Sequence, residues 1–352
     1  MMHTPMSFRC GKVAKNRFVL APMTNQQSHS DGTLSTEEAH WLEMRSSGGF
    51  GVIITCAAFV SRGGIGFNGQ MGVTPDLISG PHLELNERIH QEQSLSLVQL
   101  YHGGNRVALN RIEGEAVSPM GDATRGVKQA TTEQIHEIRD RFVEAAVVAK
   151  QWGYDGVQLH AAHGYLLCDF LSSTNQRSDD YGGSLENRTR LLLDLVRLVR
   201  KRCGEGFIIS VRLSPERFGI NTDEVLDVAQ MLNNTEMVDL LDWSLWDVAK
   251  IVEGRSLLES VLALDYGDTQ VSVAGKVMGA RMVDAVLTVG ADAVAIGRGA
   301  ILHHDFPHLC ADKNFQCRTL PVSVDTLLTE GLSMTFVDYM RRWDNFVQTS
   351  TE

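Results

Sequence analysis

The chain has 352 residues, of which 43% are hydrophobic and 21% are charged, as in an ordinary globular protein. Its formal net charge of −11 argues against a nucleic-acid or anionic-membrane partner, because both require a basic face. The start of the chain has no apolar run of signal-peptide length, and no stretch approaches the roughly 18 apolar residues of a membrane span. We therefore expect a cytoplasmic protein.

Eight short apolar runs alternate with helical patterns along the chain. The runs are apolar at nearly every position, which is typical of parallel strands covered on both faces. Strands are predicted within residues 17–23, 51–57, 95–101, 155–161, 207–213, 237–246, 269–275 and 291–297. Helices are predicted between them, within residues 35–47, 80–93, 132–151, 187–202, 223–233, 254–264 and 279–289.

This alternation predicts an α/β fold, a closed (β/α)₈ TIM barrel, with an open doubly wound sheet as the competing architecture. We expect a single domain over residues 1–352. The barrel would occupy about residues 8–305, and a C-terminal helical extension about residues 306–352. Arg341, Arg342 and Trp343 are expected on a helix of that extension.

Residues 64–69 spell G-x-G-x-x-G, the pattern of a dinucleotide-binding turn. Such a turn must leave a strand directly and open a helix. Here six residues separate it from the preceding strand, and the following residues 70–75 do not begin a helix. We interpret the pattern as a mobile glycine-rich loop, and predict no nicotinamide-binding domain of that type.

Cysteine usage indicates a reducing compartment. No two of the six cysteines are spaced C-x-x-C, so reduced structural thiols are expected.

Polar side chains gather just after the predicted fourth strand. His160 and His163 are three residues apart and Tyr165 follows, so several hydrogen-bond donors lie at one strand end. Strand ends in α/β barrels converge on the substrate. Ordinary buried histidines are one alternative. A metal site is another, with Cys168 and Asp169 as possible ligands, but no further ligand spacing is evident and we predict no metal.

Two other polar residues interrupt apolar strands. Gln99 and Arg212 need buried partners, either a structural carboxylate or a polar group of a cofactor. His102, beside Gln99, is expected to be structural. At the last two strand ends, Gly297-Arg298 and Ala274-Gly275-Lys276 are placed to hold a phosphate, with packing glycines and a surface arginine as the alternative.

Several motifs together resemble the old yellow enzyme family of flavin reductases. They occur in the family's order over about residues 8–305. They are Asn16-Arg17-Phe18, Ala21-Pro22-Met23-Thr24, Gln99-Leu-Tyr-His102-Gly-Gly104, His160-Ala-Ala-His163-Gly-Tyr165-Leu, Phe170-Leu, Asn175, Arg177, Asp180-Tyr181-Gly182-Gly183-Ser184, Glu186-Asn187-Arg188, Val211-Arg212-Leu213-Ser214 and Ile296-Gly297-Arg298.

The resemblance implies FMN bound non-covalently at the barrel mouth and NAD(P)H as electron donor. The residues implied around the flavin ring are Met23, Thr24, Ala57, Gln99 and Arg212. Those implied at the phosphate are Ala274, Gly275, Gly297 and Arg298. By the same resemblance, His160 and His163 would bind a substrate carbonyl oxygen and Tyr165 would deliver a proton. Arg212 would favour the negatively charged, reduced flavin.

The implied activity is reduction of activated alkenes such as enones or quinones by an NAD(P)H-dependent ene-reductase. Alternatives are a dienoyl-thioester reductase or amine demethylase of the same superfamily, a flavin-binding sensor without turnover, and a cofactor-free barrel isomerase or lyase. The expected partner is a small electrophilic molecule, and a homo-oligomer is possible.

Some positions depart from the family pattern. Thr24 stands where some members have a redox-tuning cysteine, and Gln26 where some place a substrate-contacting tyrosine. Only Cys310 and Cys317 follow the barrel, so an iron–sulfur cluster is not expected. Arg341 or Arg342 could reach a neighbouring subunit's pocket, although a solvated helix face is the favoured interpretation.

Overall fold

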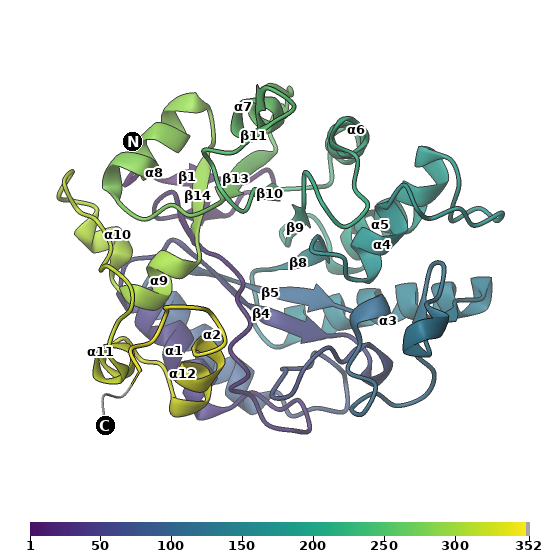
Figure 1. The fold of residues 1–352 in the computed structure, drawn as a ribbon, viewed down its shortest axis with the longest axis horizontal. Coiled ribbons are helices and arrows are strands. Elements are labelled where there is room, and N and C mark those ends of the chain that lie inside the picture. Colours follow the sequence, from purple (N-terminus) through teal and green to yellow (C-terminus); the bar gives the residue numbers. More distant parts are fainter. Residues whose placement is uncertain (350–352) are drawn as a thin grey trace.

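A computed structural model of the protein describes residues 1–349. Eight parallel strands close into a barrel, which confirms the TIM barrel and rejects the open sheet. Figure 1 shows the labelled strands at the centre of the molecule. The strands are β3 (Phe18–Leu20), β4 (Val52–Phe59), β5 (Leu95–Tyr101), β8 (Gly156–Ala161), β9 (Ile208–Leu213), β10 (Leu240–Ser244), β13 (Gln270–Ala274) and β14 (Ala293–Ile296). Each overlaps one predicted strand.

Helices follow the barrel strands and cover the outside of the barrel (Figure 1). They are α1 (Thr36–Ser47), α2 (Gly80–Gln91), α3 (Thr132–Gln151), α5 (Leu185–Cys203), α6 (Thr222–Asn233), α7 (Leu257–Leu262), α8 (Ala280–Val289) and α9 (Arg298–Leu302). Several begin at a residue whose side chain caps the helix, as Ser and Thr before a helix predict. The Ser35 side chain accepts a hydrogen bond from Glu38 N, and Thr131 forms a reciprocal capping box with Gln134.

Shorter elements lie in the loops and at the ends of the chain. They are β1 (Met6–Ser7), β2 (Val13–Ala14), β6 (Val117–Ser118), β7 (Lys128–Gln129), β11 (Ile251–Val252), β12 (Arg255–Ser256), α4 (Leu166–Leu171), α10 (Phe306–Leu309), α11 (Val324–Thr329), α12 (Met334–Met340) and the single 3₁₀ turns η1 (Arg62–Gly64), η2 (Gly104–Arg106) and η3 (Ala123–Arg125). Within residues 1–349, no helix combines the length and apolarity required to cross a bilayer.

The interior of the barrel is apolar at one end and polar toward the other. The β1–β2 hairpin contributes Met6 and Phe8 to a cluster that also holds Val52, Ile208 and Leu240 from the barrel strands. Side chains alternate along a strand, so the inward positions after Ile208 are Ser210 and Arg212. The apolar end therefore seals the N-terminal side of the barrel, and polar groups face the opposite mouth.

The C-terminal extension packs against the first helix of the barrel. Phe336 of α12 contacts Trp41 of α1 edge-on, with ring centroids 5.5 Å apart, and Figure 1 shows α11 and α12 beside α1 and α9. The prediction that Arg341, Arg342 and Trp343 lie on a helix was wrong. Helix α12 ends at Met340, and the chain turns there so that Val347 can pair with Val322.

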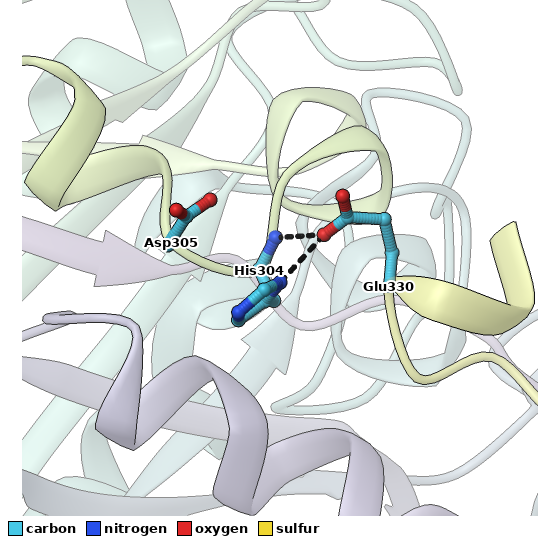
Figure 2. A group of neighbouring side chains, drawn as sticks. All are labelled: His304, Asp305 and Glu330. Carbon is cyan, nitrogen blue, oxygen red and sulfur yellow. Dashed lines mark hydrogen bonds and ion pairs between the residues drawn. The ribbon is translucent and has the colours of Figure 1, made fainter. Parts of the chain in front are cut away.

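Glu330 anchors this extension to the end of α9 (Figure 2). Its buried carboxylate lies among His304, Asp305 and Arg318. Oε2 accepts from His304 N at 2.7 Å and lies 2.7 Å from His304 Nδ1, while Oε1 accepts from Arg318 at 2.5 Å. Asp305 takes part in none of the interactions drawn in Figure 2. Because both oxygens of Glu330 already have partners, we interpret the group as a structural anchor rather than a metal site.

Removing this anchor should destabilise the protein. Glu330→Ala leaves the His304 and Arg318 donors without their acceptor, so the free energy of unfolding should fall by about 2–3 kcal/mol. Urea denaturation would measure the change. Asp305→Ala is the matched control and should change it by less than about 0.5 kcal/mol. Equal losses in both variants would contradict the assignment.

Candidate active site

A cavity of about 330 Å³ lies at the C-terminal mouth of the barrel. The ends of six strands contribute to it, since Pro22 follows β3, His163 follows β8, Arg212 and Ser244 lie on β9 and β10, Ala274 ends β13, and Gly297 follows β14. Parallel strands carry their C-terminal ends to one side, and ligands bind on that side of such barrels. Seven of the nine residues predicted to hold the cofactor line this cavity: Met23, Thr24, Arg212, Ala274, Gly275, Gly297 and Arg298.

The other two predicted cofactor residues, Ala57 and Gln99, are buried in the barrel wall and do not line the cavity. They pair with each other across β4 and β5. The side-chain amide of Gln99 donates to Gln158 Oε1 at 2.7 Å, so its partner is an interior residue of β8. The structure therefore gives Gln99 a protein partner that the sequence interpretation did not identify.

His160, His163 and Tyr165 form one cluster at the end of β8. The His160 ring lies 5.1 Å from the His163 ring and 5.1 Å from the Tyr165 ring, edge-on to both. His163 lines the cavity, and its Nε2 lies 2.8 Å from Ser244 Oγ. His163 also adopts a left-handed backbone conformation with φ 63°, which is uncommon for a residue other than glycine and is found at functional sites.

Both histidines are neutral at physiological pH. Burial, reinforced by His163 and Arg212, lowers the pKa of His160 well below its usual value. Burial, together with the charges of Arg212 and Arg106, lowers the pKa of His163 to about 3. A neutral imidazole has one N–H to donate. The Nδ1 of His160 has no hydrogen-bond partner within residues 1–349, so this ring retains unused capacity.

Tyr165 is held between an aromatic ring and a cation. The Tyr101 ring lies edge-on at 4.5 Å, and the Arg106 guanidinium lies 5.7 Å from the centre of the Tyr165 ring. Burial raises the pKa of the Tyr165 phenol, and the positive charge of Arg106 opposes that rise. The phenol therefore carries its proton at neutral pH, next to a cation that would stabilise the phenolate left behind.

Arg212 is a buried cation whose donors are only partly satisfied. Its Nε lies 3.2 Å from Asp242 Oδ2, the structural carboxylate considered in the sequence analysis; the two form an ion pair, but Nε has no hydrogen-bond partner within residues 1–349. Its remaining contacts are long, with Nη1 3.3 Å from Pro22 O and Nη2 3.5 Å from Ser244 Oγ. Pro22 and Ser244 both line the cavity. A polar ring edge of FMN at this place would supply better acceptors, so the donor set fits that cofactor.

The far end of the cavity suits a phosphate group. A Cβ added to Gly275 would lie 2.9 Å from Val248 N, so only glycine fits where the β13 loop meets the β10 loop. Arg298 is exposed and forms no ion pair within the described part of the chain, residues 1–349. Glycine backbone that a phosphate can approach closely, beside an unpaired guanidinium, is a usual way to bind that group.

The sequence interpretation missed four aromatic residues of the cavity wall, namely Trp246, Tyr339, Trp343 and, near the end of the chain, Phe346. Trp246, which is 51% exposed, follows β10 and has the Arg217 guanidinium 4.9 Å from its ring centre. Tyr339, Trp343 and Phe346 come from the C-terminal extension. An aromatic residue directly after a strand end is a signal that could have identified Trp246. Nothing local in the sequence marks the other three, because only tertiary packing brings them to the mouth.

The glycine-rich residues 64–69 open no helix, as predicted. A Cβ added to Gly66 would lie 2.1 Å from Tyr101 Oη, so this loop packs directly on the tyrosine beside Tyr165. Its glycine content therefore follows from close packing over the site, not from dinucleotide binding.

Comparisons with known proteins agree with this geometry. Residues 2–308 match the profile of the NADH:flavin oxidoreductase / NADH oxidase family. The NADPH dehydrogenase of Bacillus subtilis (strain 168) is 30% identical over 314 residues, which cover 84% of this chain and 90% of that protein. The NADH oxidase of Thermoanaerobacter brockii is 31% identical over 335 residues, 87% of this chain and 51% of that protein.

Solved structures show the same fold. The old yellow enzyme homologue from Zymomonas mobilis has a TM-score of 0.81 at 27% identity, covering 93% of this chain and 96% of that one. Morphinone reductase has a TM-score of 0.77 at 25% identity, covering 93% of this chain and 92% of that one. Some relatives are much longer: the chain spans about half of the T. brockii NADH oxidase and 35% of the NADH:fumarate oxidoreductase of Klebsiella pneumoniae (strain 342).

The lowered pKa of His163 predicts a pH-dependent stability. An unfolded histidine has a pKa near 6.5, so below that pH the unfolded chain binds a proton that the folded site rejects. Stability is fully present above about pH 6.5 and falls at lower pH. In His163→Gln, the loss of unfolding free energy between pH 7.5 and 5 should be smaller than in the wild type by about 1–2 kcal/mol.

Urea denaturation of both proteins at the two pH values would test this. His40→Gln, a change at an exposed helix position, is the control and should leave the wild-type pH dependence unaltered. An unchanged dependence in His163→Gln would show that the His163 ring is not held neutral.

Proposed function

This chain belongs to the NADH:flavin oxidoreductase / NADH oxidase family, the old yellow enzyme group that uses FMN with NAD(P)H, and from that premise we propose that it reduces activated alkenes. The observation that carries the proposal is the convergence of His160, His163 and Tyr165 beside the cavity that Arg212 lines. Two neutral donors and a protonated phenol are the groups that reduction of a conjugated carbonyl compound requires.

The histidines act on the carbonyl group of the substrate. Neutral imidazole N–H groups of His160 and His163 would donate to the carbonyl oxygen, which polarises the conjugated double bond. The hydrogen bonds strengthen as negative charge develops on that oxygen, so they stabilise the transition state more than the bound substrate. FMN, when bound, supplies the hydride that it has taken from NAD(P)H.

Tyr165 completes the reaction by general acid catalysis. Its O–H bond breaks, and the proton passes from Oη to the α-carbon of the substrate. The phenolate that remains lies beside the Arg106 guanidinium, whose positive charge stabilises it. Burial keeps the proton on the phenol until a basic carbon arrives, so proton loss to solvent does not compete.

Residues of the cavity would hold the cofactor in two groups. Met23, Thr24, Ala57, Gln99 and Arg212 are proposed for the ring, with the first two and Arg212 lining the cavity and the other two in the wall behind it. Ala274, Gly275, Gly297 and Arg298 are proposed for the phosphate.

The names of several relatives support an alkene substrate. The cinnamate reductase of Clostridium sporogenes is 36% identical over 222 residues, although this chain spans only 33% of it. The NADH:acrylate oxidoreductase of Vibrio harveyi is 31% identical over 318 residues, 31% of that protein. Both names denote conjugated acids. The superfamily alternatives, a dienoyl-thioester reductase or an amine demethylase, differ in substrate, and the assay below separates them from an enone reductase.

Tyr165→Phe tests the mechanism. Reduction of bound FMN by NAD(P)H should continue at near the wild-type rate, whereas reoxidation by cyclohexenone should slow by roughly 10²–10⁴-fold, the range of a general acid. Stopped-flow absorbance of the flavin measures both steps. Tyr181→Phe is the control and should alter neither, because the Tyr181 hydroxyl contacts His136 and the residue does not line the cavity. Equal losses in the two steps would remove Tyr165 from the role of proton donor, and a wild-type protein that no enone reoxidises would overturn the proposed function.

Arg298→Gln tests the phosphate site. Loss of a charged donor should raise the dissociation constant of FMN by tenfold or more, since a hydrogen bond to a charged group is worth about 1.5–3 kcal/mol. Riboflavin lacks the phosphate, so its affinity should be the same for the variant and the wild type. Fluorescence titration measures both ligands. A parallel loss of riboflavin affinity would indicate a general disturbance of the pocket.

A further inference from the structure

A chain of polar side chains crosses the barrel interior directly beneath the cavity. Gln158 of β8 receives a hydrogen bond from Gln99 and donates one to Ser210 Oγ at 3.0 Å. Its Nε2 also lies 3.3 Å from Asp242 Oδ2 on β10. Ser272 of β13 donates to Asp242 Oδ1 at 2.8 Å. These hydrogen-bonded side chains therefore come from five strands, and Asp242 contacts those of two of the other four.

Asp242 is the only carboxylate in this chain of residues, and it is entirely enclosed. Its side chain is 0% exposed, and that of Arg212 is 5% exposed. The register pairs Asp242 directly with Arg212 on β9 and with Ser272 on β13. Leu240, the preceding inward residue on β10, belongs to the apolar cluster below. Asp242 thus lies between the apolar seal and the cavity, where no solvent screens its charge.

The ion pair divides the guanidinium of Arg212 into two sides. Nε lies 3.2 Å from Asp242 Oδ2 in an ion pair that is not a hydrogen bond, while Nη1 and Nη2 approach Pro22 and Ser244, both residues of the cavity wall. A long side chain without such a partner would lose this orientation, because the barrel offers the guanidinium no other carboxylate within 4 Å in the described part of the chain. Asp242 therefore fixes the direction in which the cation points and offsets part of its charge.

We propose that Asp242 is a positioning residue that holds Arg212 toward the flavin and, with Ser272, sets how strongly the cation favours the reduced cofactor. This inference rests on the proposed placement of FMN against Arg212. A flavin gains electron density on reduction, so the positive charge of Arg212 favours the reduced form and the negative charge of Asp242 opposes it. Hydrogen bonds to the carboxylate spread its charge and weaken that opposition.

Two substitutions then have opposite expected effects. Asp242→Asn keeps the size of the side chain and removes its charge, so the two-electron midpoint potential of bound FMN should rise. Ser272→Ala removes one donor from the carboxylate and leaves its charge more concentrated, so the potential should fall by a smaller amount. For Asp242→Asn, at least a tenfold gain in preference for reduced FMN is expected, which is about 30 mV for a two-electron couple.

The experiment is a spectroscopic redox titration of the FMN-loaded enzyme against reference dyes, with no alkene present. Ser96→Ala is the matched control, because Ser96 is a buried serine of β5 whose hydroxyl has no hydrogen-bond partner within residues 1–349. Its potential should equal that of the wild type. Thermal denaturation of each variant would identify any loss of folding.

The outcomes are distinct. A rise for Asp242→Asn with a fall for Ser272→Ala supports the inference, whereas shifts of the same sign, or none, overturn it and indicate a purely structural network. If Asp242→Asn does not fold, the potential of Ser272→Ala decides alone: a lower potential than in the wild type supports the inference, and an unchanged potential overturns it. If the two variants shift the potential in opposite directions but the enzyme reduces no alkene, this inference is supported and only the proposed function is rejected. If the protein binds no FMN, both this inference and the proposed function are rejected.

Discussion

A positive charge inside a closed barrel is the constraint around which this structure is built. Arg212 lies within the wall of the barrel, where an unpaired cation would be strongly destabilising. Asp242 meets it on one side, and on the other side the guanidinium approaches the cavity through long contacts. The seal formed by Met6 and Phe8 keeps water out from below. The protein therefore keeps a cation whose charge is balanced by Asp242 on the inner side and which is available on the outer side, as suits an electron-rich ring.

Barrel closure brings the chemistry to the same place. β8, β9 and β10 are neighbours in the barrel, so His160, Arg212 and Ser244 reach one mouth although they are far apart in the chain. The sharp turn at His163, with its positive φ, then directs a second imidazole into the cavity, and Tyr165 follows at the start of α4. Burial makes both imidazoles neutral and keeps the phenol protonated. Exclusion of water thus keeps the imidazoles neutral, so that they can donate hydrogen bonds, and keeps on the Tyr165 phenol the proton that it is proposed to transfer.

Much of this could be predicted from the sequence, and the rest depended on contacts that no local pattern carries. Continuous apolar runs gave the parallel strands, and polar residues at a strand end pointed to His160 and Tyr165. Asp242 gave the same kind of signal as Arg212, a charge in an apolar run, although Asp239 lies in the same run; pairing Asp242 with Arg212 requires the barrel register. The helix expected at Arg341 failed because tertiary packing turns the chain there, and Trp343 became a wall residue for the same reason.

The cavity wall has two origins, since the barrel supplies most of it and Tyr339 and Trp343 come from a segment held on by contacts such as Phe336 with Trp41. Detachment of that segment would open one side of the pocket. A cofactor that binds only the closed arrangement suppresses this opening by mass action, to an extent set by its concentration relative to its dissociation constant. With FMN bound in the cavity as proposed, cofactor occupancy and the docking of the extension would be linked through one equilibrium, and a low flavin concentration would loosen α12, far along the chain from most of the barrel strands.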